Sequence, residues 1–246
     1  MPRNSFAIAF AFFMHWLRKE DLYSQQSPFI FSHYQDLITY LKSPKLFQSE
    51  SGDFSTSIFS NVARKRTPCT ENQAIKDLWK PRKKAALLCS YFCQTTAAKQ
   101  VCELGSGTGA VTRLLDQITK GQLYTFSEGD SFVSKDSFSS KTTVIRELTV
   151  AKFAAVLQDL DALDFLVIHP EFSQERIREV LSICLPRMHS TGILALGGIH
   201  QSEEMNACWQ EVRKEDRVKL TFDFFDYGVL FFDYSGPKTN LILEYK

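Results

Sequence analysis

The stretch VCELGSGTG, residues 101–109, joins an apolar run to three closely spaced glycines, and an amphipathic segment begins directly after it at Ala110. This order predicts a buried strand, a tight turn and the first turn of a helix. The glycines permit backbone conformations that other residues avoid, and they let a ligand approach without a Cβ in the way. The stretch therefore predicts a ligand-binding loop at the carboxyl end of the first strand of an α/β sheet.

Strands and helices alternate on either side of this loop. The expected strands cover residues 100–104, 122–127, 142–147, 163–169 and 192–197. The expected helices cover residues 110–118, 150–160, 173–188 and 202–214, with a short one near 131–138. Three β-rich segments follow at 218–224, 228–234 and 240–245, separated by short turns. The pattern predicts an α/β fold with a doubly wound, mostly parallel Rossmann-like sheet and an antiparallel C-terminal edge.

The sequence predicts an N-terminal helical appendage and loop over residues 1–68, followed by the main domain over residues 69–246. Two helices are expected before residue 46, broken around 24–28, and a polar loop is expected at 47–68. The main domain should open with a helix over 72–94. The apolar segment 6–17 is shorter than the roughly 20 residues that span a bilayer, so we expect no integral membrane segment. A helix packed on the domain is favoured, and a targeting or membrane-surface segment is the alternative.

Composition narrows the class of protein. Of 246 residues, 44% are hydrophobic and 23% charged, and 29 basic against 28 acidic residues give a formal charge of +1. This is ordinary globular composition, and it provides no electrostatic case for nucleic acid. The six cysteines are scattered rather than clustered, which favours a reducing, cytoplasmic location. Cys89 and Cys93 share a helix face without a second ligand pair, so no zinc site is expected there.

The loop also carries chemical information. Its glycines follow a G-x-G-x-G spacing, whereas dinucleotide-binding loops have G-x-G-x-x-G. Glu103 stands where a pyrophosphate would be repelled, which favours a ligand bearing an ammonium or sulfonium group. Glu128 ends the second strand, roughly 20 residues beyond the loop, where α/β nucleoside sites place a carboxylate for the ribose hydroxyls. The candidate cofactor-binding residues are Glu103, Gly105, Ser106, Gly107, Thr108, Gly109 and Glu128.

With these residues, the chain resembles the class I S-adenosylmethionine-dependent methyltransferases. More specifically it resembles uncharacterised Bacteroidetes methyltransferase-like proteins, through SPFIF at 27–31, IHQSEEM at 199–205 with Trp209, and GVLFF at 228–232. The resemblance implies a seven-stranded sheet, S-adenosylmethionine as the cofactor and a small-molecule acceptor. It also implies that Glu103 and Glu128 hold the methionine amine and the ribose.

The acceptor side departs from related O-methyltransferases, in which acids at the ends of the fourth and fifth strands help to hold a divalent cation. Here those strands end in IHPE, residues 168–171, and LGGIH, residues 196–200. Hard cations need oxygen ligands, and Glu171 alone remains, so no magnesium-type site is expected. His169 and His200 without a third ligand are weak evidence for a softer metal.

His200 is the candidate catalytic residue, because it follows the fifth strand at the edge where such sheets bind ligands. A histidine there acts as a general base or, with equal weight, as a hydrogen-bonding side chain before the helix at Ser202. His169 is expected to belong to a structural turn with Pro170. The leading hypothesis is methyl transfer to an oxygen or nitrogen of an unidentified acceptor. The alternative is a catalytically silent methyltransferase-fold protein that binds or interacts.

Two other enzyme classes are disfavoured. The glycine spacing and Glu103 argue against an oxidoreductase that uses a nicotinamide dinucleotide. A nucleic-acid methyltransferase would carry an Asp/Asn-Pro-Pro-Tyr type motif, which this sequence lacks, and would show a basic footprint.

Overall fold

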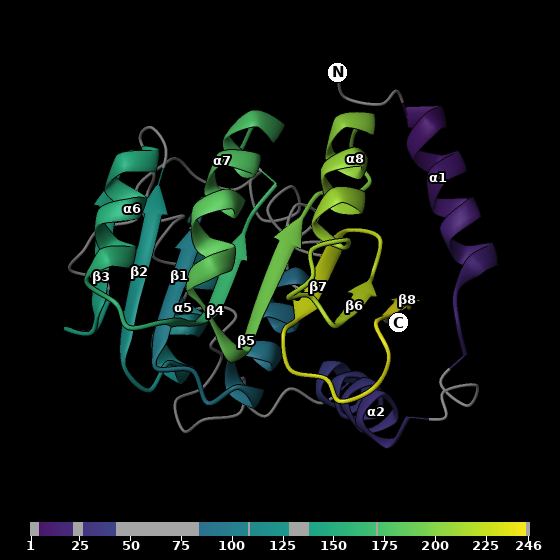
Figure 1. Cartoon of the computed structure of the whole chain (residues 1–246), viewed down its shortest axis with the longest axis horizontal. Helices are drawn as coiled ribbons and strands as arrows, with labels where there is room; N and C mark the ends of the chain where they lie inside the picture. The colour runs from purple at the N-terminus through teal and green to yellow at the C-terminus, as the bar shows by residue number, and fades with distance from the viewer. Residues whose placement is uncertain are drawn as a thin grey trace, which may run out of the picture.

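The computed structural model describes residues 5–21, 27–42, 84–107, 109–127, 138–170 and 172–244, with side chains from residue 7 onward. Its centre is one sheet of eight strands in the order β3-β2-β1-β4-β5-β7-β6-β8 (Figure 1). The strands are β1 Gln100–Leu104, β2 Gln122–Ser127, β3 Thr142–Arg146, β4 Leu163–Ile168, β5 Met188–Gly197, β6 Leu220–Asp223, β7 Tyr227–Phe231 and β8 Thr239–Ile242. The mostly parallel sheet expected from the sequence is confirmed.

The strand count and the position of the reversed strand correct the expectation. We expected seven strands, and the sheet has eight. β7 pairs antiparallel with both β5 and β6, whereas β8 pairs parallel with β6. The reversed strand thus lies inside the sheet. Because β7 runs opposite to β6, it ends at the edge of the sheet where β6 begins. The connection 232–238 therefore crosses past β6 along that edge, and β8 starts there and runs parallel to β6.

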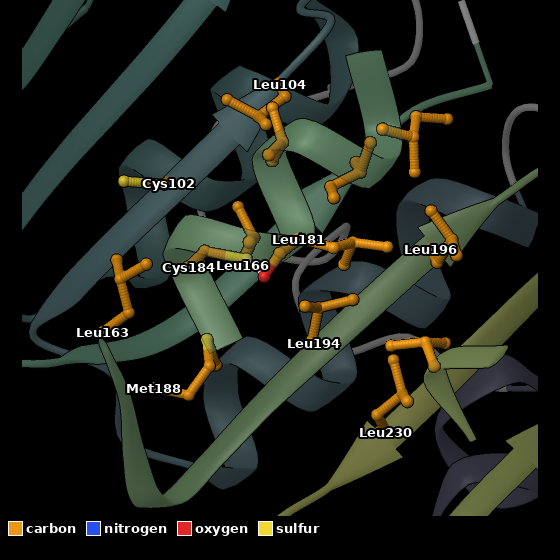
Figure 2. Close-up of a cluster of buried hydrophobic side chains, with 14 of the residues drawn as sticks. Cys102, Leu104, Leu163, Leu166, Leu181, Cys184, Met188, Leu194, Leu196 and Leu230 are labelled. Carbon is orange, nitrogen blue, oxygen red and sulfur yellow. Dashed lines mark hydrogen bonds between the residues drawn. The ribbon is translucent and has the colours of Figure 1, made fainter. Parts of the chain in front are cut away.

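Helices cover both faces of the sheet, as Figure 1 shows. On one face lie α6 (Val150–Gln158), α7 (Gln174–Cys184) and α8 (Glu203–Val212), and a 3₁₀ turn at Leu185–Arg187 leads from α7 into β5. Figure 2 shows the core on this side, where Leu181 and Cys184 of α7 lie among Leu166, Leu194 and other strand residues. Thr149, Ser173 and Ser202 cap these three helices by accepting a backbone N–H three residues on.

The other face is covered by α2 (Pro28–Lys42), a helix over residues 84–95 and α5 (Ala110–Ile118). Ile30, Leu37, Phe92 and Leu115 from these helices join one buried cluster with the strands. The helices expected at 110–118 and in the N-terminal region are therefore confirmed. The expected segments 72–83 and 131–137 lie outside the described residues. The division at residue 68 stays a prediction, although α2 contributes to the core of the main domain.

Helix α1 (Ser5–Arg18) lies beyond the β8 side of the sheet (Figure 1). The Glu20 N–H donates to the Ile242 carbonyl at 2.7 Å, and His15 is buried against β6. Most of its large apolar side chains face outward: Phe10, Phe12, Phe13, Trp16 and Leu17 are exposed. Among the described residues, no helix combines the length and apolar character needed to cross a bilayer. Among the described residues, the helix thus packs on the sheet side through His15 and through Phe12, whose ring meets Phe225 edge-on at 5.1 Å, while much of its apolar surface is exposed.

Candidate functional site

The glycine loop follows β1 at the point where the chain order of the sheet reverses, with β2 on one side and β4 on the other. Gly105, Gly107 and Gly109 have φ of 93°, 48° and 75°, a left-handed region that favours glycine. The N–H groups of Gly105 and Ser106 donate to the Phe126 carbonyl at 2.9 and 3.1 Å, which fixes the loop to β2. In open α/β sheets, ligands bind in the crevice outside the carboxyl ends of the strands at such a reversal.

Two buried serine hydroxyls lie in the loop and at the end of β2. Among the described residues, Ser106 Oγ and Ser127 Oγ are buried and make no hydrogen bond. Ser106 lies in the loop, and Ser127 is the last residue of the adjacent β2. A buried hydroxyl without a partner costs free energy, so such a group in a native protein requires an explanation. A polar ligand in the crevice supplies one. Thr108 and Glu128, two further candidates, lie outside the described residues, as does Glu171.

Glu103 lies beneath the loop and is fully buried. Its Oε2 accepts hydrogen bonds from the hydroxyls of Thr112 on α5, at 2.6 Å, and Thr125 on β2, at 2.8 Å. Its Oε1 lies 3.2 Å from Nε2 of His169, which follows β4. The carboxylate therefore joins β1, β2, α5 and the end of β4. These contacts give Glu103 a structural role beneath the loop, and the ligand-amine role expected from the sequence stays a prediction.

His169 continues this network toward β7. Its Nδ1 lies 2.7 Å from the hydroxyl of Tyr227, and its backbone N–H donates to the Leu104 carbonyl at 2.9 Å. Both ring nitrogens thus have partners, and His169 and Tyr227 are both buried. These contacts agree with the structural role expected for His169. They connect it to Glu103 and Tyr227, however, and not only to a turn with Pro170.

His200 belongs to a second, separate polar cluster at the same edge of the sheet. Its Nε2 lies 2.9 Å from Oδ2 and 3.1 Å from Oδ1 of Asp223, the last residue of β6. Its Nδ1 faces the side-chain amide nitrogen of Asn206 at 2.9 Å. From α1, Nε2 of His15 approaches Oδ1 of Asp223 at 3.0 Å. The structure therefore does not bring His200 together with His169.

Asp223 is the centre of this second cluster. Trp209 Nε1 donates to its Oδ2 at 3.2 Å, and the Phe225 N–H donates to its Oδ1 at 3.0 Å. Burial alone raises the pKa of the Asp223 carboxyl, but hydrogen bonds and charges from His15 and His200 outweigh it and hold the pKa well below its usual range. The carboxylate is therefore ionised near neutral pH.

Sequence reasoning did not single out His15, Ser127, Asp223 or Tyr227. His15 lies inside the apolar segment 6–17, and Tyr227 falls in the turn expected between the β-rich segments 218–224 and 228–234. Asp223 did carry a usable signal, since it follows the strand residues LTF at 220–222 in a sheet whose strand ends form the site.

Comparison with known proteins places the fold. No family model matches the chain, and no curated protein matches it. Several solved structures do. An O-methyltransferase from Bacillus cereus in complex with SAH (S-adenosylhomocysteine) is 11% identical with a TM-score of 0.55, covering 80% of this chain and 97% of its own. The O-methyltransferase TomG from Streptomyces achromogenes in complex with SAM is 10% identical with a TM-score of 0.52, covering 79% and 94%.

A further match is a protein from Staphylococcus aureus assigned as a candidate caffeoyl-CoA O-methyltransferase, 12% identical with a TM-score of 0.55, covering 80% of this chain and 99% of its own. At such low identity the likeness shows the fold alone: the chain has the fold of the class I S-adenosylmethionine methyltransferases. The narrower Bacteroidetes group stays a prediction.

Proposed function

We propose that this protein is an S-adenosylmethionine-dependent methyltransferase that acts on an oxygen or nitrogen of a small-molecule acceptor. One observation carries the proposal: the left-handed glycine loop after β1 stands beside two buried serine hydroxyls that lack partners among the described residues. That combination fits a polar nucleoside ligand at the sheet's switch point. Neighbours of the same fold hold SAM or SAH, which supports this choice of cofactor.

The residues of the loop divide the work of binding. Gly105, Gly107 and Gly109 shape the loop, and the hydroxyls of Ser106 and Ser127 donate to the ligand. Thr108 and Glu128 stay proposed cofactor residues, with Glu128 assigned to the ribose. Glu103 supports the loop from below through Thr112 and Thr125.

When bound, the cofactor supplies a methyl group on an already activated sulfonium. The protein then needs chiefly to hold the acceptor in line and to exclude water. His169 follows β4 and Tyr227 begins β7, at the same edge of the sheet as the loop, and their hydrogen bonds to each other and to Glu103 provide a rigid wall there. In this proposal His200 is not the general base, because both its ring nitrogens have protein partners.

The alternative function is a catalytically silent protein that binds the cofactor without turnover. The same engaged histidines favour it, since neither ring presents a free nitrogen in this arrangement. An acceptor whose own pKa is low would be deprotonated without a protein base, so the engaged histidines do not exclude turnover. Only an activity measurement separates the two hypotheses.

The test is transfer of a labelled methyl group from S-adenosylmethionine into a fractionated metabolite extract, with SAH formation measured in parallel. Transfer by wild type, and its loss in Gly107→Val, supports the enzyme; the variant forces a branched side chain into a left-handed position. Cofactor binding without any labelled product would favour the silent alternative. A wild type that neither binds nor transfers would refute both.

A further inference from the structure

Three side chains able to ligate a metal meet beside the ends of β5 and β6. His15 comes from α1, His200 from the segment after β5, and Asp223 from the end of β6, and their ligand atoms all lie within 4.8 Å of one another. Figure 1 shows how far apart in the chain these elements are, from the first helix to the C-terminal strands. We propose that His15, His200 and Asp223 bind a divalent transition-metal ion of the zinc type.

The geometry requires little movement for metal binding. Both imidazoles present the same atom, Nε2, to the carboxylate, with His15 at 3.0 Å from Oδ1 and His200 at 3.1 Å from the same oxygen. Around a tetrahedral zinc ion with bonds of about 2.0–2.1 Å, neighbouring ligand atoms lie about 3.3 Å apart. Each histidine nitrogen therefore needs to move only a few tenths of an ångström farther from Oδ1, and all three ligand atoms already lie within 4.8 Å of one another.

Neighbouring groups already orient the ligands. Trp209 donates to Oδ2 of Asp223 and the Phe225 N–H donates to Oδ1, so the carboxylate is fixed in place. His15 approaches Oδ1, and His200 lies close to both oxygens. The Asn206 amide contacts Nδ1 of His200. When Nε2 binds a metal, the ring proton lies on Nδ1, and the amide oxygen of Asn206 accepts a hydrogen bond from that N–H after the amide turns over. Metal-bound histidines usually have such a partner on the second nitrogen.

The surroundings of the cluster favour a tightly held ion. The side chains of His15, Asp223 and His200 are 6%, 4% and 15% exposed. The Phe225 ring stacks on His200 and meets His15 edge-on, with centroids 5.1 and 5.4 Å apart. A carboxylate buried in this way needs a compensating positive charge, and a divalent ion supplies it.

The ligand types select the metal. Two imidazole nitrogens and one carboxylate suit zinc and similar transition metals, whereas magnesium and calcium need more oxygen ligands. The sequence interpretation expected no metal because His169 and His200 lacked a third ligand. In the structure His169 belongs to the Glu103 network, and the missing ligands come from α1 and β6. The site is independent of methyl transfer, and it would fasten α1 to the sheet.

The experiment is a calorimetric zinc titration of the full, tag-free chain after removal of metals with a chelator. We expect one ion per chain at micromolar or tighter affinity. His15→Gln and Asp223→Asn should each weaken it at least about 100-fold, since loss of outer-shell partners alone costs about 10–100-fold. His189→Gln is the matched control, because His189 is exposed at the opposite end of β5 and, within the part of the chain that the structure describes, bonds only to Thr191.

Two further readouts keep the test decisive. Zinc should raise the melting temperature of wild type but not of His15→Gln, and that variant carries the test if Asp223→Asn does not fold. Cobalt substituted for zinc should give visible bands without thiolate charge transfer. The proposal would be overturned if wild type bound no zinc with a Kd below about 100 μM, or if His189→Gln lost as much zinc affinity as His15→Gln. Unchanged zinc affinity in His15→Gln, or a thiolate band in the cobalt spectrum, would overturn it too.

Discussion

The role of Glu103 beneath the loop can be tested by Glu103→Gln, which removes the charge and keeps the shape. Two threonine hydroxyls donate to Oε2 of Glu103 in a fully buried setting. Hydrogen bonds to charged groups contribute about 1.5–3 kcal/mol and neutral ones about 1 kcal/mol. Making two such bonds neutral should therefore lower the free energy of unfolding by about 2 kcal/mol. The amide nitrogen faces His169, which can accept from it in its other tautomer.

The assay is urea unfolding followed by circular dichroism, with slopes compared to confirm that the variant unfolds like wild type. Glu147→Gln is the matched control, because the Glu147 side chain is 78% exposed and its one ion pair among the described residues is with Lys152 at the surface. Its unfolding free energy should change by less than about 0.5 kcal/mol. If Glu103→Gln changed stability as little as Glu147→Gln does, the carboxylate would not be the support that we infer.

The same variant separates support from direct ligand contact. If Glu103 only holds the loop, folded Glu103→Gln should bind SAH less than about tenfold more weakly than wild type, which is about 1.4 kcal/mol. A loss of a hundredfold or more, with unchanged stability, would instead assign the carboxylate to the ligand amine.

Three other predictions concern the core and the second cluster. Gly228→Ala should lower the free energy of unfolding by about 1–3 kcal/mol, because its Cβ would stand 2.5 Å from the Trp209 ring; an unchanged urea midpoint would contradict this packing. Because the folded-state pKa of Asp223 is lowered, its stabilisation is present above the unfolded value of about 3.9 and is lost as the pH falls toward the folded value. Metal-free Asp223→Asn should thus lose less stability than wild type between about pH 5 and pH 2, and parallel curves would count against the assignment. Burial raises the pKa of Cys93 to about 12, and the other described cysteines are buried too. A thiol reagent should therefore modify no cysteine other than Cys69 before the protein unfolds. Rapid modification of the folded Cys69→Ser variant would refute this.

The parts of the fold that sequence predicted best are those with local causes. The bounds of β1, β2 and α5 agree with the expected ranges, because apolar runs and glycines mark each of their ends. The number and direction of the last strands were harder. Short β-rich segments separated by turns resemble an antiparallel series, and only pairing across the sheet shows that β8 runs parallel to β6.

The candidate site divides in the same way. Its loop follows from nearby glycines, whereas its polar networks depend on residues that meet only after folding. His15 and Asp223 are 208 residues apart in the chain, and no local pattern links them. The threonine contacts of Glu103 could not be predicted, because Thr125 becomes its neighbour only through the pairing of β1 with β2, and its assignment to the ligand amine stays a prediction.

The proposed cofactor site is tested most directly by titrating SAH into wild type and Ser127→Ala. The account predicts one saturable site in wild type at micromolar affinity. It also predicts that Ser127→Ala, which removes a buried hydroxyl without a partner among the described residues, is as stable as wild type or more so, yet binds SAH about tenfold more weakly. No binding by wild type at about 1 mM SAH would contradict the account.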